Sequence, residues 1–211
     1  MRRLALALSL SLATFGACTV GDAGPDPEPD PDPDPDAVVE ISGVVADSAT
    51  WSGTVKLLAD ATIASGATVT IAAGTSFTAA DGAKLSVEGT LLVAGTAAAP
   101  VSMLPEDGAV SWAGMVAENG GSVTVQFATG TDIATVLYCH AGALACVLAD
   151  VEFEGMGNAL IAEGTASIDR SRFVDMANGG VSVRSGGDLT IVDTTMLTSS
   201  GDIVVQQGGD L

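Results

Sequence analysis

Residues 61–103 read ATIASGATVTIAAGTSFTAADGAKLSVEGTLLVAGTAAAPVSM. Short β-prone runs alternate here with single glycines, and the runs are Val69–Ile71, Ser76–Thr78, Leu85–Val87 and Leu91–Val93. Apolar and small polar residues often alternate within a run, which is typical of a strand with one buried face. Strands this short, with glycine at the corners, do not suit an ordinary β-sandwich. The stretch therefore predicts a coil that has several short strands in each turn.

The second half of the chain repeats itself every 20–23 residues. Three hexapeptides align without gaps, and they begin at Leu148, Ile168 and Ile191. Such repeats, with β-prone composition, indicate a solenoid in which each coil buries its apolar face against its neighbours. In the alignment Phe153, Phe173 and Met196 share a column that we expect to face inward. The Leu/Asn pattern of leucine-rich repeats is absent, which leaves a parallel β-helix.

Four segments resemble a known family: ATVTIAAGT at 67–75, LSVEGTLLVAGT at 85–96, Pro100-Val101 and WAG at 112–114. They are similar to the N-terminal coils of right-handed parallel β-helix proteins of bacterial cell envelopes, in the broad pectate-lyase-like group. The resemblance covers about residues 55–211 and implies an all-β, right-handed parallel β-helix solenoid. We expect about seven or eight coils of 20–23 residues. Because the group includes lyases, hydrolases and adhesins, the resemblance implies a fold rather than a reaction.

The N-terminus has the features of an export signal over residues 1–17. Two arginines precede about a dozen apolar or small residues, too few for the roughly 20 of a spanning helix. The next four residues, FGAC, resemble a bacterial lipobox, with Phe15 in place of the usual leucine. The resemblance implies that Cys18 is lipidated, and Thr19 after it implies the outer membrane or cell surface. The alternative is cleavage near Ala23, which gives a secreted or periplasmic protein.

Six prolines alternate with acidic residues between positions 25 and 35. Proline restricts the backbone and like charges repel, so this segment stays extended and cannot form a core. We interpret residues 18–37 as a disordered tether, and residues 38–211 as the folded β-helix domain that it holds away from a lipid surface.

The formal net charge is −19, with only seven Lys and Arg residues in the chain. No basic patch is available for phosphates, so the sequence excludes nucleic acid as a partner. Electrostatic docking on anionic lipid is disfavoured for the same reason. The expected contact with a membrane is the lipid anchor.

Charged residues of the repeats fall in two further columns of the alignment. Asp150, Arg170 and Asp193 share one column, and Glu152 and Arg172 share the other. Adjacent strands lie about 4.8 Å apart, and opposite charges on them contribute about 0.2–1 kcal/mol per pair. We interpret the columns as structural charge ladders that fix the register. The alternative is an acid–arginine site for sugar binding or lyase chemistry.

Cys139 and Cys146 bracket the segment CHAGALAC. Because export permits oxidation, we expect a structural disulfide. The alternatives are two reduced, packed thiols or a metal site with His140, although this spacing lacks the paired pattern of a zinc module. His140 is the only histidine, so a Ser-His-Asp or Cys-His catalytic pair would have to use it. No Gly-x-Ser-x-Gly accompanies it, and we expect no catalytic residue.

Acids in the repeats raise the question of calcium. Asp150, Glu152 and Glu154 alternate and so share one strand face, with Asp169 and Asp175 nearby. Calcium binds six to eight oxygens. The favoured interpretation is solvated acids that aid solubility, so no metal and no cofactor are expected.

Neither the Gly-His-Gly nor the Asp-Asp pair of polygalacturonases occurs in the chain. We therefore expect a non-catalytic envelope lipoprotein whose β-helix serves surface interaction or adhesion, with a polysaccharide or an envelope protein as partner. The alternative is a polysaccharide lyase or glycoside hydrolase of the pectate-lyase-like group, and a third reading is a degenerate fragment with no ligand. Residues 205–211 repeat residues 183–189, and no polar cap follows them. The C-terminal coil is thus expected either to need a capping partner or to be short relative to its relatives.

Overall fold

The structure is a computed structural model that describes residues 38–198 and 203–205. The expected export signal (1–17), the lipidation site Cys18, the tether (18–37) and the last copy of the repeat (206–211) lie outside the described residues. All regular elements within the described ranges are β-strands. No helix in these ranges has the length and apolar character needed to cross a bilayer.

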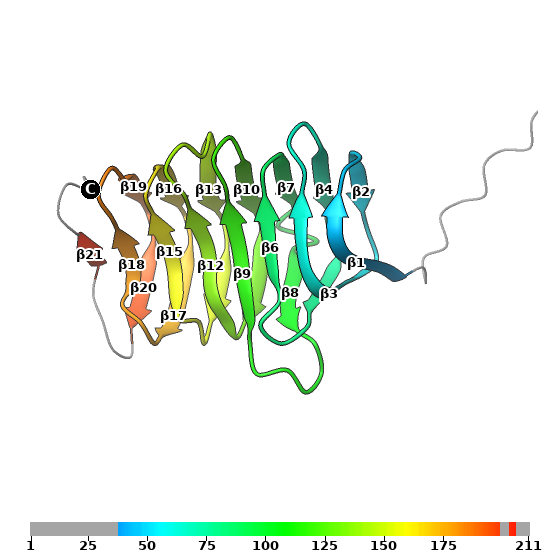
Figure 1. Cartoon of the computed structure of the whole chain (residues 1–211). Coiled ribbons are helices and arrows are strands. Elements are labelled where there is room, and N and C mark those ends of the chain that lie inside the picture. The colour runs from blue at the N-terminus through cyan, green and yellow to red at the C-terminus, as the bar shows by residue number, and fades with distance from the viewer. Residues whose placement is uncertain (1–37, 199–202, 206–211) are drawn as a thin grey trace, which may run out of the picture. The chain divides into compact units, whose positions relative to one another are not determined.

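Short parallel strands stack into three walls, each with about one strand per turn (Figure 1). The first wall is a seven-stranded sheet. Its strands, in spatial order, are β2 (Ala49–Trp51), β4 (Thr68–Ala72), β7 (Thr90–Ala94), β10 (Ser122–Gln126), β13 (Ala145–Ala149), β16 (Thr165–Asp169) and β19 (Asp188–Val192).

The second and third walls belong to one fourteen-stranded sheet, because the long strand β3 (Thr54–Ile63) runs through both of them. The second wall continues with β5 (Ser76–Ala79), β8 (Val101–Pro105), β11 (Ala128–Thr131), β14 (Glu152–Glu154), β17 (Arg172–Met176) and β20 (Thr195–Thr198). The third wall continues with β6 (Lys84–Val87), β9 (Trp112–Ala117), β12 (Ile133–Cys139), β15 (Asn158–Ala162), β18 (Gly180–Val183) and β21 (Ile203–Val205).

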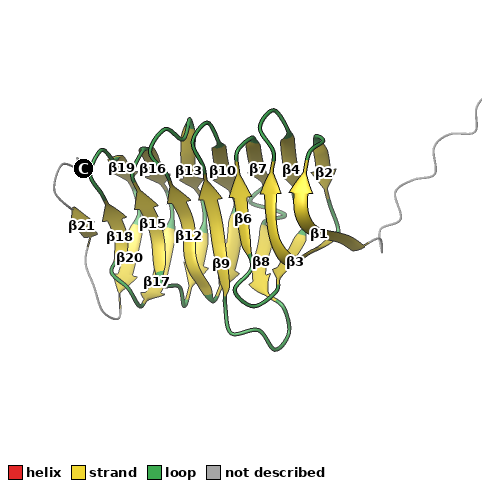
Figure 2. Cartoon of the chain, viewed as in Figure 1, coloured by secondary structure: helices red, strands yellow, loops and turns green. Residues whose placement is uncertain are grey.

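This arrangement confirms the predicted all-β solenoid of parallel strands, coloured as strands throughout in Figure 2. About six regular turns contain one strand from each wall, from β4–β5–β6 to β19–β20–β21. The sequence predicted about seven or eight coils of 20–23 residues. The difference arises at the N-terminal end. There β1 (Val38–Val45) pairs along β3 in both the second and the third wall, and no described strand of the first wall completes its turn.

The interior is a column of stacked apolar side chains, as the alignment predicted. Phe153 lies opposite Phe173, and Phe173 lies opposite Met196. The two phenylalanine rings stack with centroids 6.3 Å apart, and both are fully buried. One turn earlier the column contains Gly130, where a Cβ atom would lie 2.3 Å from the Met103 carbonyl oxygen and 2.8 Å from the Phe153 ring. The absence of a side chain at this position lets the larger neighbours fill the core.

The structure of β9 explains why tryptophan and glycine occur in the WAG segment at 112–114. Trp112 is fully buried and its ring lies 5.6 Å from that of Phe77. Gly114, two residues later, has φ +103°, and a Cβ atom there would lie 1.7 Å from the Thr135 carbonyl oxygen. Only glycine permits this backbone conformation together with so close an approach of the next strand.

Candidate functional site

A cluster of polar side chains lies where four consecutive strands of the third wall end. We call it the polar edge, and it consists of Glu118, Tyr138, His140, Glu163 and Arg184. Four of these residues directly follow β9, β12, β15 and β18, at positions that the strand register stacks on one another. The solenoid therefore brings together the only histidine and the only tyrosine in the chain with an arginine and two glutamates.

Tyr138 is the hydrogen-bonding centre of the polar edge. Its hydroxyl donates to Glu163 Oε1 at 2.5 Å and accepts a hydrogen bond from Arg184 Nη1 at 2.8 Å. Arg184 Nη1 also donates to Glu163 Oε1, at 3.1 Å. The Arg184 guanidinium carbon lies 5.2 Å from the centre of the Tyr138 ring. These contacts cross three turns of the solenoid and fix the three side chains relative to one another.

His140 stacks on Tyr138 and extends the cluster to Glu118. The two rings stack, with centroids 4.4 Å apart and an interplanar angle of 26°. Nδ1 of His140 lies 3.3 Å from Glu163 Oε2, and Nε2 lies 3.7 Å from Glu118 Oε2. A neutral imidazole has one N–H to donate, whereas a protonated ring can donate to both carboxylates.

These contacts affect the acidity of two groups. Burial raises the pKa of the Tyr138 hydroxyl, and its hydrogen bond to Glu163 raises it further, so the phenol stays protonated. The same hydrogen bond is the largest cause that lowers the pKa of the Glu163 carboxyl, with Arg184 and His140 contributing in the same direction. Glu163 is therefore a stable carboxylate, and its environment does not suit a general acid at neutral pH.

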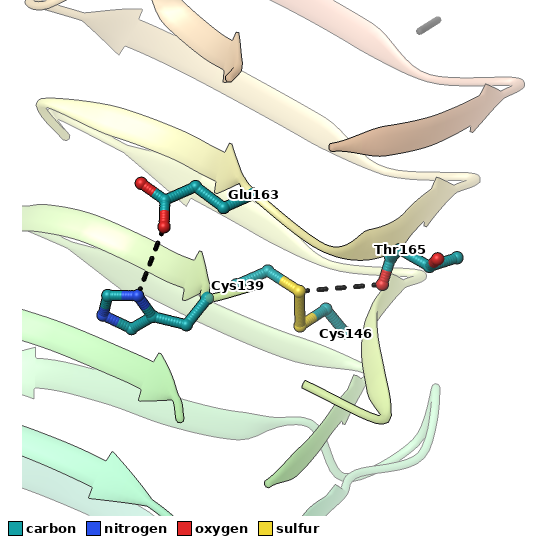
Figure 3. The surroundings of a disulfide bond; sticks show 5 residues. Cys139, Cys146, Glu163 and Thr165 are labelled. Carbon is teal, nitrogen blue, oxygen red and sulfur yellow. Dashed lines mark hydrogen bonds and ion pairs between the residues drawn. A yellow bond between two sulfur atoms is a disulfide. The ribbon is translucent and has the colours of Figure 1, made fainter. Parts of the chain in front are cut away.

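The expected disulfide between Cys139 and Cys146 is present, with Cα atoms 6.0 Å apart and both residues buried. It joins the end of β12 to β13 and closes the loop that contains His140. The Cys139 carbonyl accepts a hydrogen bond from the Glu163 amide at 2.8 Å. Cys139 Sγ lies 3.6 Å from the Thr165 carbonyl oxygen, on the turn that stacks against the disulfide (Figure 3). The disulfide thus anchors the backbone directly beside Tyr138 and His140.

The charged columns predicted from the repeats lie away from the polar edge. Arg170 donates through Nε and Nη2 to the two Asp150 oxygens at 2.9 and 2.7 Å, and Nη1 pairs with Asp169. Asp150, Arg170 and Asp193 all have positive φ, at the corner where the chain leaves the first wall. Asp193 follows Arg170 in the column, but the guanidinium contacts Asp150 on the preceding turn and Asp169, its neighbour in sequence.

Glu152 lies opposite Arg172 in the second wall, and Arg172 Nε is 3.5 Å from Glu152 Oε1. Glu152 and Glu154 border a hollow of about 230 Å³, below the roughly 300–1,000 Å³ of ligand pockets. Both glutamates are exposed. Within the part of the chain that the structure describes, no three or more acidic, histidine or cysteine side chains group closely enough to hold a metal ion.

The outward side of the first wall is a second candidate surface, which we call the hydroxyl face. All six pairings of this sheet are parallel and none has a register shift, whereas the fourteen-stranded sheet has several. Two outward columns define the face: Thr50, Thr70, Leu92, Thr124, Val147, Ser167 and Thr190, and beside it Thr68, Thr90, Ser122, Ala145, Thr165 and Asp188. Nine of these thirteen residues carry a hydroxyl group, and neither column contains a base. A third outward column, at the carboxyl ends of the strands, includes Gln126 and Asp169.

The sequence indicated the hydroxyl face only through the alternation of apolar and small polar residues within the strands. It did not predict the polar edge. The repeat pattern does not single out Tyr138, and the sequence suggests His140 only as a catalytic or metal-binding residue. A signal existed in the spacing, because Glu118, His140, Glu163 and Arg184 follow one another at intervals of 22, 23 and 21 residues. These intervals equal the repeat length, but the four residues differ in type, so an alignment of like residues does not group them.

Comparison of the chain with protein-family models, with curated proteins and with solved structures gave no match.

Proposed function

We propose that this protein is an exported lipoprotein of the bacterial envelope whose β-solenoid binds an extended polysaccharide without cleaving it. The observation that carries the proposal is the hydroxyl face. Hydroxyl groups both donate and accept hydrogen bonds. Six of the seven strands of this wall, which stack about 4.8 Å apart, carry at least one hydroxyl in the two columns, and β13 carries none. A regular surface of this kind suits a polymer that lies across several turns.

The export signal and the FGAC segment before Thr19 support the anchoring part of the proposal. A stable lipid anchor needs more than one acyl chain, which the diacylglyceryl group on Cys18 supplies. The expected result is incorporation of labelled palmitate into the wild-type chain and none into Cys18→Ala. Equal labelling of the two chains, or no labelling of either, would contradict the anchor.

Binding and cleavage are measured together. The full chain is screened on a glycan array with and without calcium, and polyuronate is incubated with it while the absorbance of the unsaturated product is followed. The proposal predicts glycan binding that calcium does not alter and no rise in absorbance. No binding to any glycan would reject the proposed function.

A polysaccharide lyase is the second candidate, and the polar edge is the observation that favours it. The Tyr138 hydroxyl is hydrogen-bonded to the Arg184 cation, and the Tyr138 ring stacks on the His140 imidazole, so a proton donor, a cation and an imidazole meet at Tyr138. A rise in absorbance that Tyr138→Phe and His140→Gln both abolish would establish this candidate. The same rise in Arg172→Gln would show that the loss is specific to the polar edge.

A further inference from the structure

The three arginines of the described solenoid differ in how they use their N–H groups. An arginine has five N–H donors, and its Nε and Nη2 form the fork that binds a carboxylate or similar oxyanion through two parallel hydrogen bonds. Arg170 directs this fork to Asp150. Arg172 uses Nε on Glu152. Arg184 uses only Nη1, and its Nε and Nη2 have no partner among residues 38–198.

Arg184 is held in place, although no residue among 38–198 occupies its fork. Nη1 donates to both Tyr138 and Glu163, and the guanidinium packs against the Tyr138 ring. The side chain is 39% exposed. Because the anchoring contacts already restrict the side-chain rotamers, a ligand that binds the fork loses little affinity to the ordering of Arg184.

The charge of the molecule restricts what this fork can bind. Residues 38–211 contain 19 acidic residues against five Lys and Arg, and Glu163 lies beside Arg184 itself. A polymer with an anionic group on every sugar would be repelled along the whole solenoid. A single anionic group on an otherwise uncharged polymer meets one open fork and avoids most of this repulsion.

We propose that the Nε/Nη2 fork of Arg184 binds an isolated carboxylate or sulfate ester on an otherwise uncharged glycan. The inference rests on the proposed function and names the chemical class of its ligand. Tyr138 and Glu163 act as positioning residues that hold the guanidinium. The ligand class is distinct from a polyuronate, in which every sugar carries a charge.

The test uses the full chain and four probes in isothermal titration. The probes are a neutral oligosaccharide with one glucuronate, its carboxyl-reduced twin, its monosulfated twin and polygalacturonate. Hydrogen bonds to a charged group predict that the glucuronate or the sulfate probe binds at least about tenfold more tightly than the reduced twin. Arg184→Gln and Arg184→Lys are expected to remove this difference, since lysine keeps the charge but lacks the fork. Arg172→Gln, the matched control, is expected to retain it.

The outcomes separate this inference from the proposed function. Equal affinity for all three short probes, with Arg184→Gln unchanged, would overturn the inference and leave glycan binding by the hydroxyl face intact. Tightest binding to polygalacturonate, or no binding of either anionic probe, would also overturn it. A difference that persists in Arg184→Gln would assign the anion to another residue.

Discussion

Replacing Tyr138 by phenylalanine removes one oxygen atom and keeps the ring that stacks on His140. The variant loses the hydrogen bond donated to Glu163 and the one accepted from Arg184. Hydrogen bonds to charged groups contribute about 1.5–3 kcal/mol, and the partial exposure of Tyr138 favours the lower end. We therefore expect the free energy of unfolding to fall by about 1.5 kcal/mol and the melting temperature by about 3–6 °C.

Urea denaturation followed by circular dichroism measures this change, and a double-mutant cycle with Glu163→Gln isolates its origin. If the hydroxyl acts through Glu163, the two effects are not additive and the interaction energy is about 1 kcal/mol. A Tyr138→Phe variant as stable as wild type, or effects that add within about 0.3 kcal/mol, would refute the assignment of Tyr138 as the centre of the polar edge.

Three further predictions concern the fold and its response to pH. Gly114→Ala places a Cβ atom 1.7 Å from a carbonyl oxygen, so its free energy of unfolding should fall by at least about 3 kcal/mol. The control Gly108→Ala, at φ +88° with no atom within 4 Å of the new Cβ, should lose only about 1 kcal/mol. Equal urea midpoints for the two variants would contradict this difference. The Cys139→Ala/Cys146→Ala variant should have a free energy of unfolding about 2.5 kcal/mol lower, because the disulfide closes a loop between cysteines 7 positions apart. Unchanged thermal unfolding would argue against the disulfide. The lowered pKa of Glu163 stabilises the fold above 4.5, the ordinary value for glutamate, and this stabilisation is lost as the pH falls through the folded-state pKa. Glu163→Gln should therefore flatten the decline of the unfolding free energy between pH 4.5 and the lower, folded-state pKa of Glu163, and a decline as steep as in wild type would exclude this role.

The short-range pattern of the sequence predicted the elements of the solenoid well. The runs at 69–71, 76–78, 85–87 and 91–93 lie within β4, β5, β6 and β7. Strand alternation and repeat spacing together fix which residues face inward, because a slip of one residue would expose the column of Phe153 and Phe173. The predicted register of this column is therefore the register of the structure.

Side-chain partners depend on information that the repeat pattern lacks. Arg170 lies between Asp150 and Asp193 in its column, and the pattern alone does not decide which acid it binds. The structure directs it to Asp150, where both oxygens accept hydrogen bonds. The repeat pattern does not predict the polar edge either. Tyr138 and Arg184 are 46 residues apart, and their contact depends on the lengths and rotamers of the two side chains.

Two matched threonine variants test whether the glycan lies on the hydroxyl face. Thr124 lies in the middle of the hydroxyl face, and Thr129 faces outward from β11 in the second wall. The measurement is the dissociation constant of the glycan found on the array, for wild type, Thr124→Arg and Thr129→Arg. We expect Thr124→Arg to bind the glycan at least about tenfold more weakly, because a long charged side chain interrupts the hydroxyl face. We expect Thr129→Arg to bind the glycan as tightly as wild type. Unchanged binding for Thr124→Arg, or an equal loss in both variants, would contradict a ligand on the hydroxyl face.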